Sequence, residues 1–412
     1  MYAPLSNQQY VALAQQYGTP LYVYHAPTIA SQYQRLQQGF AGTHARFFYA
    51  CKALTNPHVL RYMHSLGVGA DCSSINEVRI AMLAGFAPQQ ILYTSNGIHF
   101  SEIAEAVALG VHVNIDSLSN LQKFGEAYGG GYPVGIRLRP NIMAGGNIKI
   151  STGHAASKFG IPVEQANEVV ELIKQYQLHI NCLHIHTGSE IKEVAVFMEG
   201  MEVIFKLLPL FNQLEYIDLG GGFKVPYGPG DAATDIEELG REVGIAFTQM
   251  AQFYGRPLQP WFEPGKFLVS SAGALVVQVN VLKHTPHMSF AGVNSGFNHL
   301  IRPMFYDSYH TILNASNPNG PQHTYQVVGN ICETDTFANG RALPQIREGD
   351  YLVFLNAGAY GFEMSSNFNS RLKPAEVLID EQGQPQLIRR RQVFSDLLTH
   401  IPGFENADMP GQ

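Results

Sequence analysis

A lysine at the end of an apolar run is the residue whose chemistry says most about this sequence. Lys52 directly follows Arg46-Phe47-Phe48-Tyr49-Ala50-Cys51, a run with the length and composition of a buried strand. A lysine with a desolvated stem gives up its proton more readily, and its free amine can condense with an aldehyde. Taken alone, Lys52 is more simply interpreted as a lysine whose stem lies on apolar surface and whose ammonium group reaches water.

Several other polar residues also follow short apolar runs. The glycine run Gly220-Gly221-Gly222 can present backbone N–H groups to a phosphate, and Ser189 offers a further hydroxyl. The imidazole of His186 can stack on a planar ring, and the turn Glu263-Pro264-Gly265 fixes a carboxylate. Each group alone has an ordinary explanation as a cap, a turn or a core residue. Together with Lys52 they describe a site for pyridoxal phosphate, in which the carboxylate holds the proton of the pyridinium nitrogen.

The elements that must position these residues repeat regularly. Between about residues 45 and 263, eight short apolar runs alternate with segments of helical periodicity. This alternation is typical of parallel strands joined by crossover helices, and eight units close a barrel. We expect an α/β fold with a (β/α)8 barrel, and a doubly wound open sheet is the alternative. The expected strands are 46–51, 68–71, 90–93, 111–115, 133–138, 180–186, 215–219 and 259–263, and the expected helices are 57–66, 74–84 with Ser74 as N-cap, 101–109, 117–127, 163–176, 193–211 and 234–254.

In a parallel barrel the chemistry gathers where the strands end, at the carboxyl rim. The residues expected there are unusually polar: Lys52, Asp71, Asn96, Asp116, Arg137, Arg139, His184, His186, Gly220, Gly221, Gly222 and Glu263. A long polar, glycine-rich segment, 139–161, follows the fifth expected strand and is placed on the same rim. Segments of that length in compact domains tend to be functional or disordered.

A second domain follows the barrel pattern. After residue 264, short runs separated by Gly, Pro and Asn turns indicate an antiparallel β domain, a barrel or a sandwich. Its expected strands are 274–283, 289–293, 324–329, 351–355, 375–380 and 386–391, and the leading run 20–24 can pair with them. We expect the cofactor-binding barrel over 25–275, and a discontinuous β domain over 1–24 and 276–412 that contributes substrate and dimer contacts.

Composition excludes several classes of protein. The 412 residues are 45% hydrophobic and 14% charged, as in a globular enzyme of two domains. The net charge of −7 comes without a basic run, so nucleic acid is not an expected partner. Cys51, Cys72, Cys182 and Cys332 are scattered and lack zinc or disulfide spacing, so we expect no metal site and a cytoplasmic location. The sequence contains neither a signal-peptide pattern nor an apolar run long enough for a membrane span.

Long motifs extend over roughly residues 20–395. They are Tyr49-Ala50-Cys51-Lys52-Ala53, His184-Ile185-His186-Thr187-Gly188-Ser189, Asp218-Leu219-Gly220-Gly221-Gly222, Glu263-Pro264-Gly265, Leu300-Ile301-Arg302-Pro303-Met304-Phe305-Tyr306, Gly329-Asn330-Ile331-Cys332-Glu333-Thr334-Asp335, Asn356-Ala357-Gly358-Ala359-Tyr360-Gly361 and Met364-Ser365-Ser366-Asn367-Phe368-Asn369-Ser370-Arg371. With these motifs the sequence resembles the alanine-racemase-like, fold type III, pyridoxal-phosphate-dependent decarboxylases. Within them it resembles the diaminopimelate decarboxylases.

The resemblance implies roles for the matching residues. Lys52 would hold the cofactor covalently, His186 would stack on its ring, and Glu263 would bind the pyridine nitrogen. The phosphate would be held by Ser189, Gly220, Gly221, Gly222 and Tyr360, and the cofactor site would include Asp71, Gly265 and Lys266. The substrate would be bound by Lys266, Arg302, Tyr306, Glu333 and Tyr360. The family forms homodimers, which implies that Cys332 and Glu333 act in the partner's site, the thiol as a catalytic proton donor and the carboxylate on the distal ammonium.

The implied activity is decarboxylation of meso-2,6-diaminopimelate to L-lysine and CO2, the last step of lysine biosynthesis. One residue departs from the family pattern, because Lys266 stands where the family usually has arginine after Glu-Pro-Gly. Lysine offers a point charge in place of a bidentate fork. Either Lys266 contacts the substrate carboxylate through one bond, with Arg302, Lys149 or Lys158 compensating, or the substrate differs.

Alternatives follow from this departure and from the simpler roles of single residues. The first alternative is a decarboxylase of the same fold for ornithine, arginine, carboxynorspermidine or a citrate-conjugated diamino acid, and an amino-acid racemase fits the motifs less well. The alternative from another class is a noncatalytic, regulatory protein that binds pyridoxal phosphate. Taken singly, Cys332 could be a core cysteine, Tyr306 and Tyr360 packing aromatics, and Arg302 part of a loop salt bridge.

Overall fold

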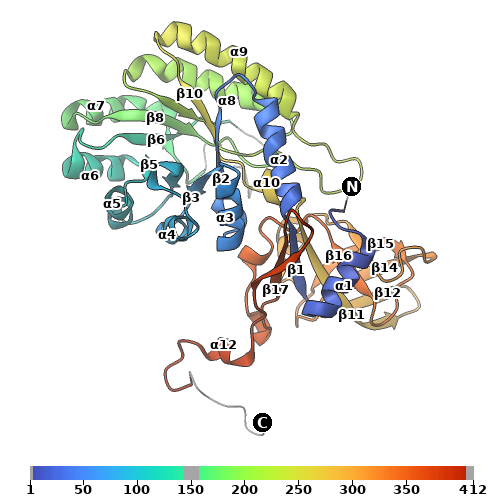
Figure 1. Ribbon diagram of the computed structural model, residues 1–412. Coiled ribbons are helices and arrows are strands. Elements are labelled where there is room, and N and C mark those ends of the chain that lie inside the picture. Colours follow the sequence, from blue (N-terminus) through green and yellow to red (C-terminus); the bar gives the residue numbers. More distant parts are fainter. Residues whose placement is uncertain (1–2, 143–156, 405–412) are drawn as a thin grey trace. The chain divides into compact units, whose positions relative to one another are not determined.

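The computed structural model describes residues 3–142 and 157–404, and Figure 1 shows its helices and strands. The chain divides into two compact units. The barrel unit contains Ala30–Val225 and Ala232–Leu268, and the sheet unit contains Met1–Ile29, Pro226–Asp231 and Val269–Gln412. The domain limits expected from the sequence, 25–275 for the barrel and 1–24 with 276–412 for the β domain, stay a prediction. The units differ from them chiefly at 226–231, a segment that follows the seventh barrel strand but is grouped with the sheet.

The barrel unit contains eight parallel strands that close on themselves. They are β2 (Arg46–Ala50), β3 (Gly69–Cys72), β4 (Ile91–Thr94), β5 (His112–Ile115), β6 (Val134–Arg139), β8 (Ile180–Ile185), β9 (Tyr216–Asp218) and β10 (Gln259–Phe262). Strand β2 pairs with both β3 and β10, and the β5–β6 pairing closes the ring. The expected (β/α)8 barrel is therefore confirmed against the open sheet, with all eight strands found within two residues of their expected limits. A two-residue strand, β7 (Ile161–Pro162), adds to the side of β6.

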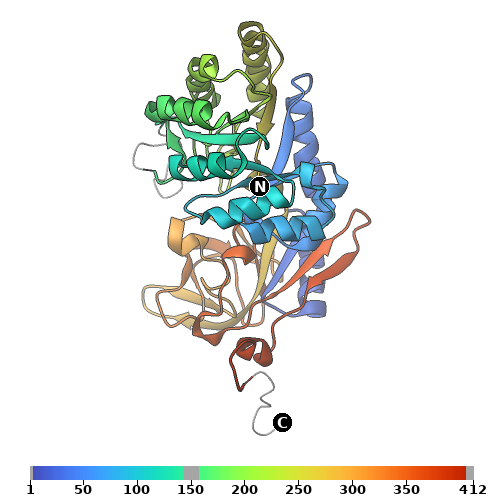
Figure 2. The same cartoon turned by 90° about the vertical axis from the view of Figure 1, so that its left-hand side faces the viewer.

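Helices alternate with these strands and surround them in both ribbon views (Figures 1 and 2). Local sequence sets where they begin: Ser74 Oγ accepts the N–H of Glu77 at 3.2 Å, as expected of an N-cap, and Asn56 caps α3 with Pro57 as its first residue. The helices are α2 (Ala26–Gly39), α3 (Pro57–Ser65), α4 (Ile75–Leu83), α5 (Phe100–Ala108), α6 (Leu118–Tyr128), α7 (Ala166–Tyr176), α8 (Val194–Leu207), α9 (Ile236–Tyr254) and the four-residue α10 (Lys266–Val269).

Aromatic side chains fill the barrel near the beginnings of its strands. The Trp261 ring stacks on the Tyr216 ring with centroids 3.9 Å apart. The His112 ring packs edge-on against Trp261, with centroids 5.3 Å apart. His112 and Tyr216 are the first residues of β5 and β9. Phe48, buried completely, packs against Trp261 from β2. This packing makes one end of the barrel apolar and leaves the polar residues at the carboxyl ends of the strands.

The sheet unit contains one mixed sheet of nine strands. They are β1 (Leu21–His25), β11 (Gly273–His284), β12 (Ser289–Val293), β13 (Ile312–Asn314), β14 (Gln322–Val328), β15 (Thr336–Pro344), β16 (Tyr351–Phe354), β17 (Ala375–Ile379) and β18 (Pro385–Arg389). The leading run pairs with this sheet as expected. Most strand pairs are antiparallel as expected, but two pairs, β1 with β17 and β12 with β14, are parallel. The two strands of each parallel pair are far apart in the sequence or joined by a long connection, so no hairpin turn makes them antiparallel.

Short helices and a common apolar core complete the sheet unit. The helices are α1 (Asn7–Tyr17), α11 (Arg302–Tyr306) and α12 (Phe394–Leu398). Leu21 and Val23 of β1 pack with Val276, Val353 and Val377 of the neighbouring strands. None of the helices in the described ranges is long and apolar enough to cross a membrane. Most of the long segment 139–161, with Lys149, lies outside the described residues.

Candidate active site

Lys52 contacts a buried carboxylate at the carboxyl end of the barrel. It lies in a single 3-10 turn, Cys51–Ala53, that follows β2 directly. Its Nζ donates a hydrogen bond to Oδ2 of Asp71 at 3.0 Å, and Asp71 comes from the neighbouring strand, where it pairs with Ala50. The Asp71 side chain is 2% exposed and that of Lys52 43%. The fold therefore brings together two of the predicted site residues and leaves the Lys52 side chain partly exposed.

Three buried carboxyl groups lie at this end of the barrel and differ in charge. Burial, together with the nearby charge of Glu263, raises the pKa of Asp71 to about 7, and the same causes raise the pKa of Asp218 well above its usual range. Burial also opposes ionisation of Glu263, but His184 and Lys52 outweigh it and hold the pKa of Glu263 below its ordinary value. Glu263 is therefore the carboxyl group that keeps its negative charge.

Two histidines of the predicted motif flank Glu263. The Nε2 atom of His184 lies 3.4 Å from Glu263 Oε1, and burial lowers the pKa of His184 while Glu263 opposes that change. Burial lowers the pKa of His186 to about 3, with the charge of Arg137 as the next cause. His186 is therefore a neutral imidazole, and its Nδ1 accepts the N–H of Gly221 at 3.2 Å. This bond fixes the ring beside the glycine run.

Arg137 is a buried cation to which the sequence assigned no role. It lies in β6, is 7% exposed, and its guanidinium carbon stands 4.8 Å from the centre of the Phe159 ring. Burial lowers its pKa, whereas Glu263 and Asp116 oppose that change. Lys158, which we considered as a compensating cation, has its Nζ 5.1 Å from the same ring. Arg137 lies within the expected strand 133–138, and nothing in the sequence distinguished it from a surface arginine.

The glycine run has no room for side chains. Gly220 and Gly222 adopt φ angles of +67° and +99°, which favour glycine. A Cβ atom at Gly222 would lie 2.4 Å from the carbonyl oxygen of Gly188, and one at Gly221 would lie 2.4 Å from that of Glu263. Gly265 is similarly close to Ala50, with 3.0 Å between the Cβ positions. The segments after β8, β9 and β10 thus approach one another by their backbones, as a phosphate cradle requires.

Lys266 lies beside the hydroxyl group that we predicted for the phosphate. Its side chain is 8% exposed, and its Nζ donates to Glu190 Oε1 at 2.7 Å and to Ser189 Oγ at 3.3 Å. Lys224 Nζ lies 3.9 Å from the other oxygen of Glu190. Glu190 could not be predicted from the sequence, since only the fold brings the segments after β8 and β10 together.

Three groups in the barrel have the types and spacing of metal ligands. His184, Asp218 and Glu263 each offer one ligand atom, and these atoms lie within 4.8 Å of one another. Spacing along the chain could not reveal this cluster, because its members come from three strands. One of the three, Glu263, is the charged carboxylate that we assigned to the cofactor from the sequence, and we assign no metal to the cluster.

In the sheet unit, Arg302 is surrounded by tyrosine rings. It begins α11 and is 4% exposed. Its guanidinium carbon lies 5.1 Å from the Tyr227 ring centre, 5.7 Å from that of Tyr306 and 6.0 Å from that of Tyr360. Within the described ranges Arg302 forms no ion pair, so the loop salt bridge is not observed there. Tyr227 was not among the predicted site residues, and the one signal for it in the sequence is the turn-rich stretch Pro226-Tyr227-Gly228-Pro229-Gly230.

Cys332 and Glu333 are both exposed on the sheet unit. The backbone N–H of Cys332 donates to Asn369 Oδ1 at 3.0 Å, which ties it to another motif of the sequence. The alternative interpretation of Cys332 as a core cysteine is therefore wrong, whereas Cys51, Cys72 and Cys182 are buried.

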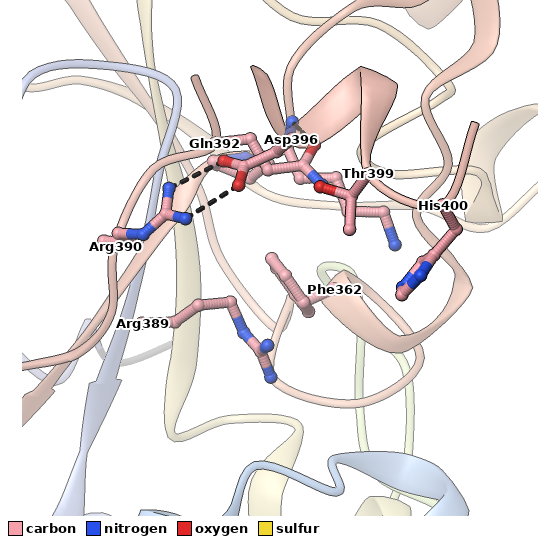
Figure 3. Close-up of a pocket in the computed structure, with 9 residues that line it drawn as sticks. Phe362, Arg389, Arg390, Gln392, Asp396, Thr399 and His400 are labelled. Carbon is pink, nitrogen blue, oxygen red and sulfur yellow. Dashed lines mark hydrogen bonds and ion pairs between the residues drawn. The ribbon is translucent and has the colours of Figure 1, made fainter. Parts of the chain in front are cut away.

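A separate pocket of about 520 Å³ lies in the sheet unit (Figure 3). Its arginines already have partners: Arg390 makes two bonds to Asp396, at 2.6 and 2.7 Å, and Arg389 pairs with the buried Glu376. It is lined by Phe362, Lys373, Pro374, Arg389, Arg390, Gln392, Asp396, Thr399 and His400. None of these is a predicted site residue, and we assign no function to the pocket.

Known proteins share both the sequence and the fold of this chain. Residues 26–270 match the family of the pyridoxal-dependent decarboxylases, pyridoxal binding domain. A diaminopimelate decarboxylase of Methanothermobacter thermautotrophicus is 41% identical over 399 residues, 94% of this chain and 92% of the relative. A crystal structure of diaminopimelate decarboxylase has a TM-score of 0.89 at 35% identity, covering 96% of this chain and 97% of its own. The Helicobacter pylori enzyme, complexed with L-lysine, has a TM-score of 0.86 at 29% identity, covering 95% of this chain and 98% of its own.

The barrel unit fits the cofactor that this family name implies. Lys52 offers an amine on a partly exposed side chain, and Glu263 offers a buried charged carboxylate whose Oε1 has no hydrogen-bond partner among the described residues. The glycine run offers a backbone packed so closely against the segments after β8 and β10 that only glycine fits. The match covers more than half of the chain, and the relatives cover nearly all of it. This chain therefore belongs to the diaminopimelate decarboxylase family of pyridoxal-phosphate-dependent decarboxylases.

Proposed function

We propose that the chain catalyses the decarboxylation of meso-2,6-diaminopimelate at its D-centre, giving L-lysine and CO2. The observation that carries this proposal is the pair of Lys52 with Asp71 next to a charged, buried Glu263. The identity of the relatives supports the choice of substrate, and one of the related structures holds L-lysine, the product of the proposed reaction. When bound, pyridoxal phosphate supplies an electron sink for the pair left on Cα as CO2 departs.

Asp71 can receive the proton that Lys52 must lose to act as a nucleophile. Its Oδ2 lies 3.0 Å from the Lys52 ammonium, and its pKa of about 7 is close to physiological pH. A carboxyl group at this pKa exchanges a proton readily in either direction. We assign to Lys52 the covalent attachment of the cofactor and to Asp71 the control of its protonation.

Glu263 and His186 would hold the cofactor ring. Because Glu263 stays negatively charged, it can accept a hydrogen bond from the protonated pyridine nitrogen and so favour the positively charged ring. His186 stays neutral, and its bond from Gly221 orients the imidazole so that it can stack on a ring without adding charge. These two assignments deepen the roles that the family resemblance implied.

The phosphate end is assigned to the glycine run and to Ser189. Lys266 adds a buried ammonium group next to the Ser189 hydroxyl, and we therefore assign it to the phosphate in preference to the substrate carboxylate. This assignment removes the main argument for a different substrate, because the replacement of arginine by lysine then acts on the cofactor. Gly265 and Tyr360 keep the cofactor roles expected from the resemblance.

The substrate's distal, L-configured end needs a cation for its carboxylate and an anion for its ammonium. We assign these to Arg302, with Tyr306 and Tyr360 at its guanidinium, and to Glu333. The exposed Cys332 is assigned as the proton donor to Cα after CO2 loss, acting in the partner's site of a homodimer. The homodimer and the cytoplasmic location stay predictions.

A product assay over a panel of diamino acids tests this proposal. Purified protein with added pyridoxal phosphate is incubated with meso-diaminopimelate, ornithine, arginine and carboxynorspermidine, and CO2 and amine products are measured. We expect CO2 and L-lysine from diaminopimelate alone. CO2 release confined to another member of the panel would refute the substrate, and a protein that binds the cofactor without releasing CO2 from any of them would support the regulatory alternative.

A further inference from the structure

Arg302 is a buried cation without an anion among the described residues. It is 4% exposed, its Nη2 donates to Ser308 Oγ at 3.3 Å, and its Nε has no hydrogen-bond partner in the described ranges. A buried charge is costly unless it is paired, so a structure that keeps one unpaired has a place for a ligand anion. Among side-chain cations, a guanidinium is the best match for a carboxylate.

The three tyrosine rings around Arg302 differ in how they are held. The Tyr227 ring is the nearest, with 5.1 Å from its centre to the guanidinium carbon. Tyr306 follows Arg302 within the same five-residue helix. Tyr227 is the residue that the family motifs did not single out. A tyrosine face this close attracts the cation by its quadrupole, and more strongly where water is excluded.

Tyr227 is fixed by hydrogen bonds within the sheet unit. The Ser270 hydroxyl donates to the Tyr227 hydroxyl at 2.9 Å, and the Tyr227 backbone N–H donates to Asp231 Oδ2 at 3.1 Å. Asn356 Nδ2 donates to the carbonyl oxygen of Pro226 at 2.7 Å. The segment 226–231 thus belongs to the sheet unit although it follows a barrel strand, and these bonds hold it there.

His310 also packs against the Tyr227 ring. Its imidazole meets the ring edge-on, with centroids 5.6 Å apart, and its Nδ1 lies 2.8 Å from the carbonyl oxygen of Leu355. Burial and the charge of Arg302 keep this imidazole neutral. The ring of Tyr227 therefore contacts both a neutral histidine and the guanidinium of Arg302, and these contacts restrict its movement.

We infer that Tyr227 is a positioning residue for substrate recognition, because its ring holds the Arg302 guanidinium where it receives the carboxylate remote from the reacting carbon. This inference rests on the proposed function. The remote carboxylate is bound alike before and during the reaction, so loss of the ring raises KM and leaves kcat nearly unchanged. The inference also predicts that loss of the Tyr227 ring weakens the binding of ligands that carry this carboxylate and leaves the binding of ligands without it unchanged.

Competitive inhibition by L-lysine and by 1,5-diaminopentane separates these effects, since the two differ only in the carboxylate. In Tyr227→Leu we expect the inhibition constant of L-lysine to rise about tenfold, the effect of a desolvated cation–π contact, with that of 1,5-diaminopentane unchanged. Tyr227→Phe keeps the ring and should stay within about threefold of wild type for both ligands. Tyr254→Leu, which removes a ring 5.5 Å from Arg256 in the barrel unit, is the matched control and should leave the ratio of the two constants unchanged.

Each outcome decides between the two proposals. A wild-type enzyme that decarboxylates diaminopimelate, together with a Tyr227→Leu variant that keeps the wild-type ratio, would overturn the role of Tyr227 and leave the proposed function intact. Equal losses in the Phe and Leu variants would assign the effect to the hydroxyl group and overturn the role of the ring. A wild type that does not distinguish the two ligands would overturn the inference together with the assignment of Arg302. Thermal unfolding of each variant shows whether it is folded. If the Leu variant is not folded, the two inhibition constants of Tyr227→Phe still test the inference, because a large change in their ratio would contradict it.

Discussion

Asp71 should destabilise the cofactor-free protein in a pH-dependent way. Its side chain is 2% exposed, and burial raises its pKa from 3.8 to about 7. Between these two pH values the folded state keeps a proton that the unfolded state has lost. Stability therefore falls as pH rises, by about 1.4 kcal/mol per pH unit, and levels off above pH 7. The shift of about 3 units corresponds to about 4 kcal/mol at pH 8.

The replacement Asp71→Asn removes this titration and keeps the shape of the side chain. We expect the variant to be more stable than wild type at pH 8 by up to about 4 kcal/mol, and the difference to disappear near pH 4. The attraction between Asp71 and Lys52 already contributes to the pKa of about 7. The lysine left behind is 43% exposed, so water can solvate its charge. The carboxyl group that we propose to receive the lysine's proton would thus destabilise the cofactor-free protein.

Urea denaturation of the cofactor-free protein, followed by tryptophan fluorescence, measures the effect. The chain has one tryptophan, Trp261, which is 3% exposed in β10 and reports on the barrel unit. Glu171→Gln, at a carboxylate 73% exposed on α7, is the control, and the difference between its stability and that of wild type should be the same at pH 5 and pH 8. If Asp71→Asn were no more stable than wild type at pH 8, or if its advantage were the same at pH 5 and pH 8, the assignment of a raised pKa to Asp71 would be wrong.

Four further predictions concern the assigned roles. Lys52→Ala should abolish the visible absorption band that covalently held cofactor gives the wild type, and a retained band would remove Lys52 from that role. Glu263→Gln should lower kcat by 100-fold or more with cofactor still bound, because a neutral amide cannot hold the pyridinium proton; unchanged kcat would contradict the charge on Glu263. Lys266→Met should raise the Kd for pyridoxal phosphate about tenfold or more in titrations of cofactor-free protein, because one charge-assisted bond is lost. A normal Kd with a raised KM would show that Lys266 binds the substrate and not the phosphate. Cys332→Ala should reduce turnover severely without loss of cofactor, and normal turnover would exclude the thiol as proton donor.

Much of the fold follows from local sequence. All eight barrel strands carry their own apolar run, and Ser74 caps its helix as the sequence predicts. Strand β15 was not predicted, because Asn339-Gly340 in its middle is also the strongest signal for a turn. Its register with β14 is shifted near this point, so the strand accommodates the glycine with an irregularity. Strand β13 has only three residues and too short a pattern to recognise.

The residues of the candidate site could be predicted only where a sequence motif lies at the end of a predicted strand. Lys52, His186 and Glu263 each follow or end a strand, so an accurate strand prediction places them on one rim. The partners of Lys266 and Arg302 were not predictable, since Glu190 is 76 positions from Lys266 and Tyr227 belongs to a different part of the chain from Arg302. Such contacts depend on how distant segments meet, and periodicity contains no information about that. The charge on Glu263 likewise depends on burial and neighbours that only the structure provides.

Decarboxylation of meso-diaminopimelate labelled with ¹³C in the carboxyl group of its D-centre tests the central claim most directly. The protein with pyridoxal phosphate should release the label as CO2 and leave unlabelled L-lysine in equal amount. Label retained in the amino-acid product, or no CO2 from this substrate while another diamino acid is decarboxylated, would contradict the proposed function.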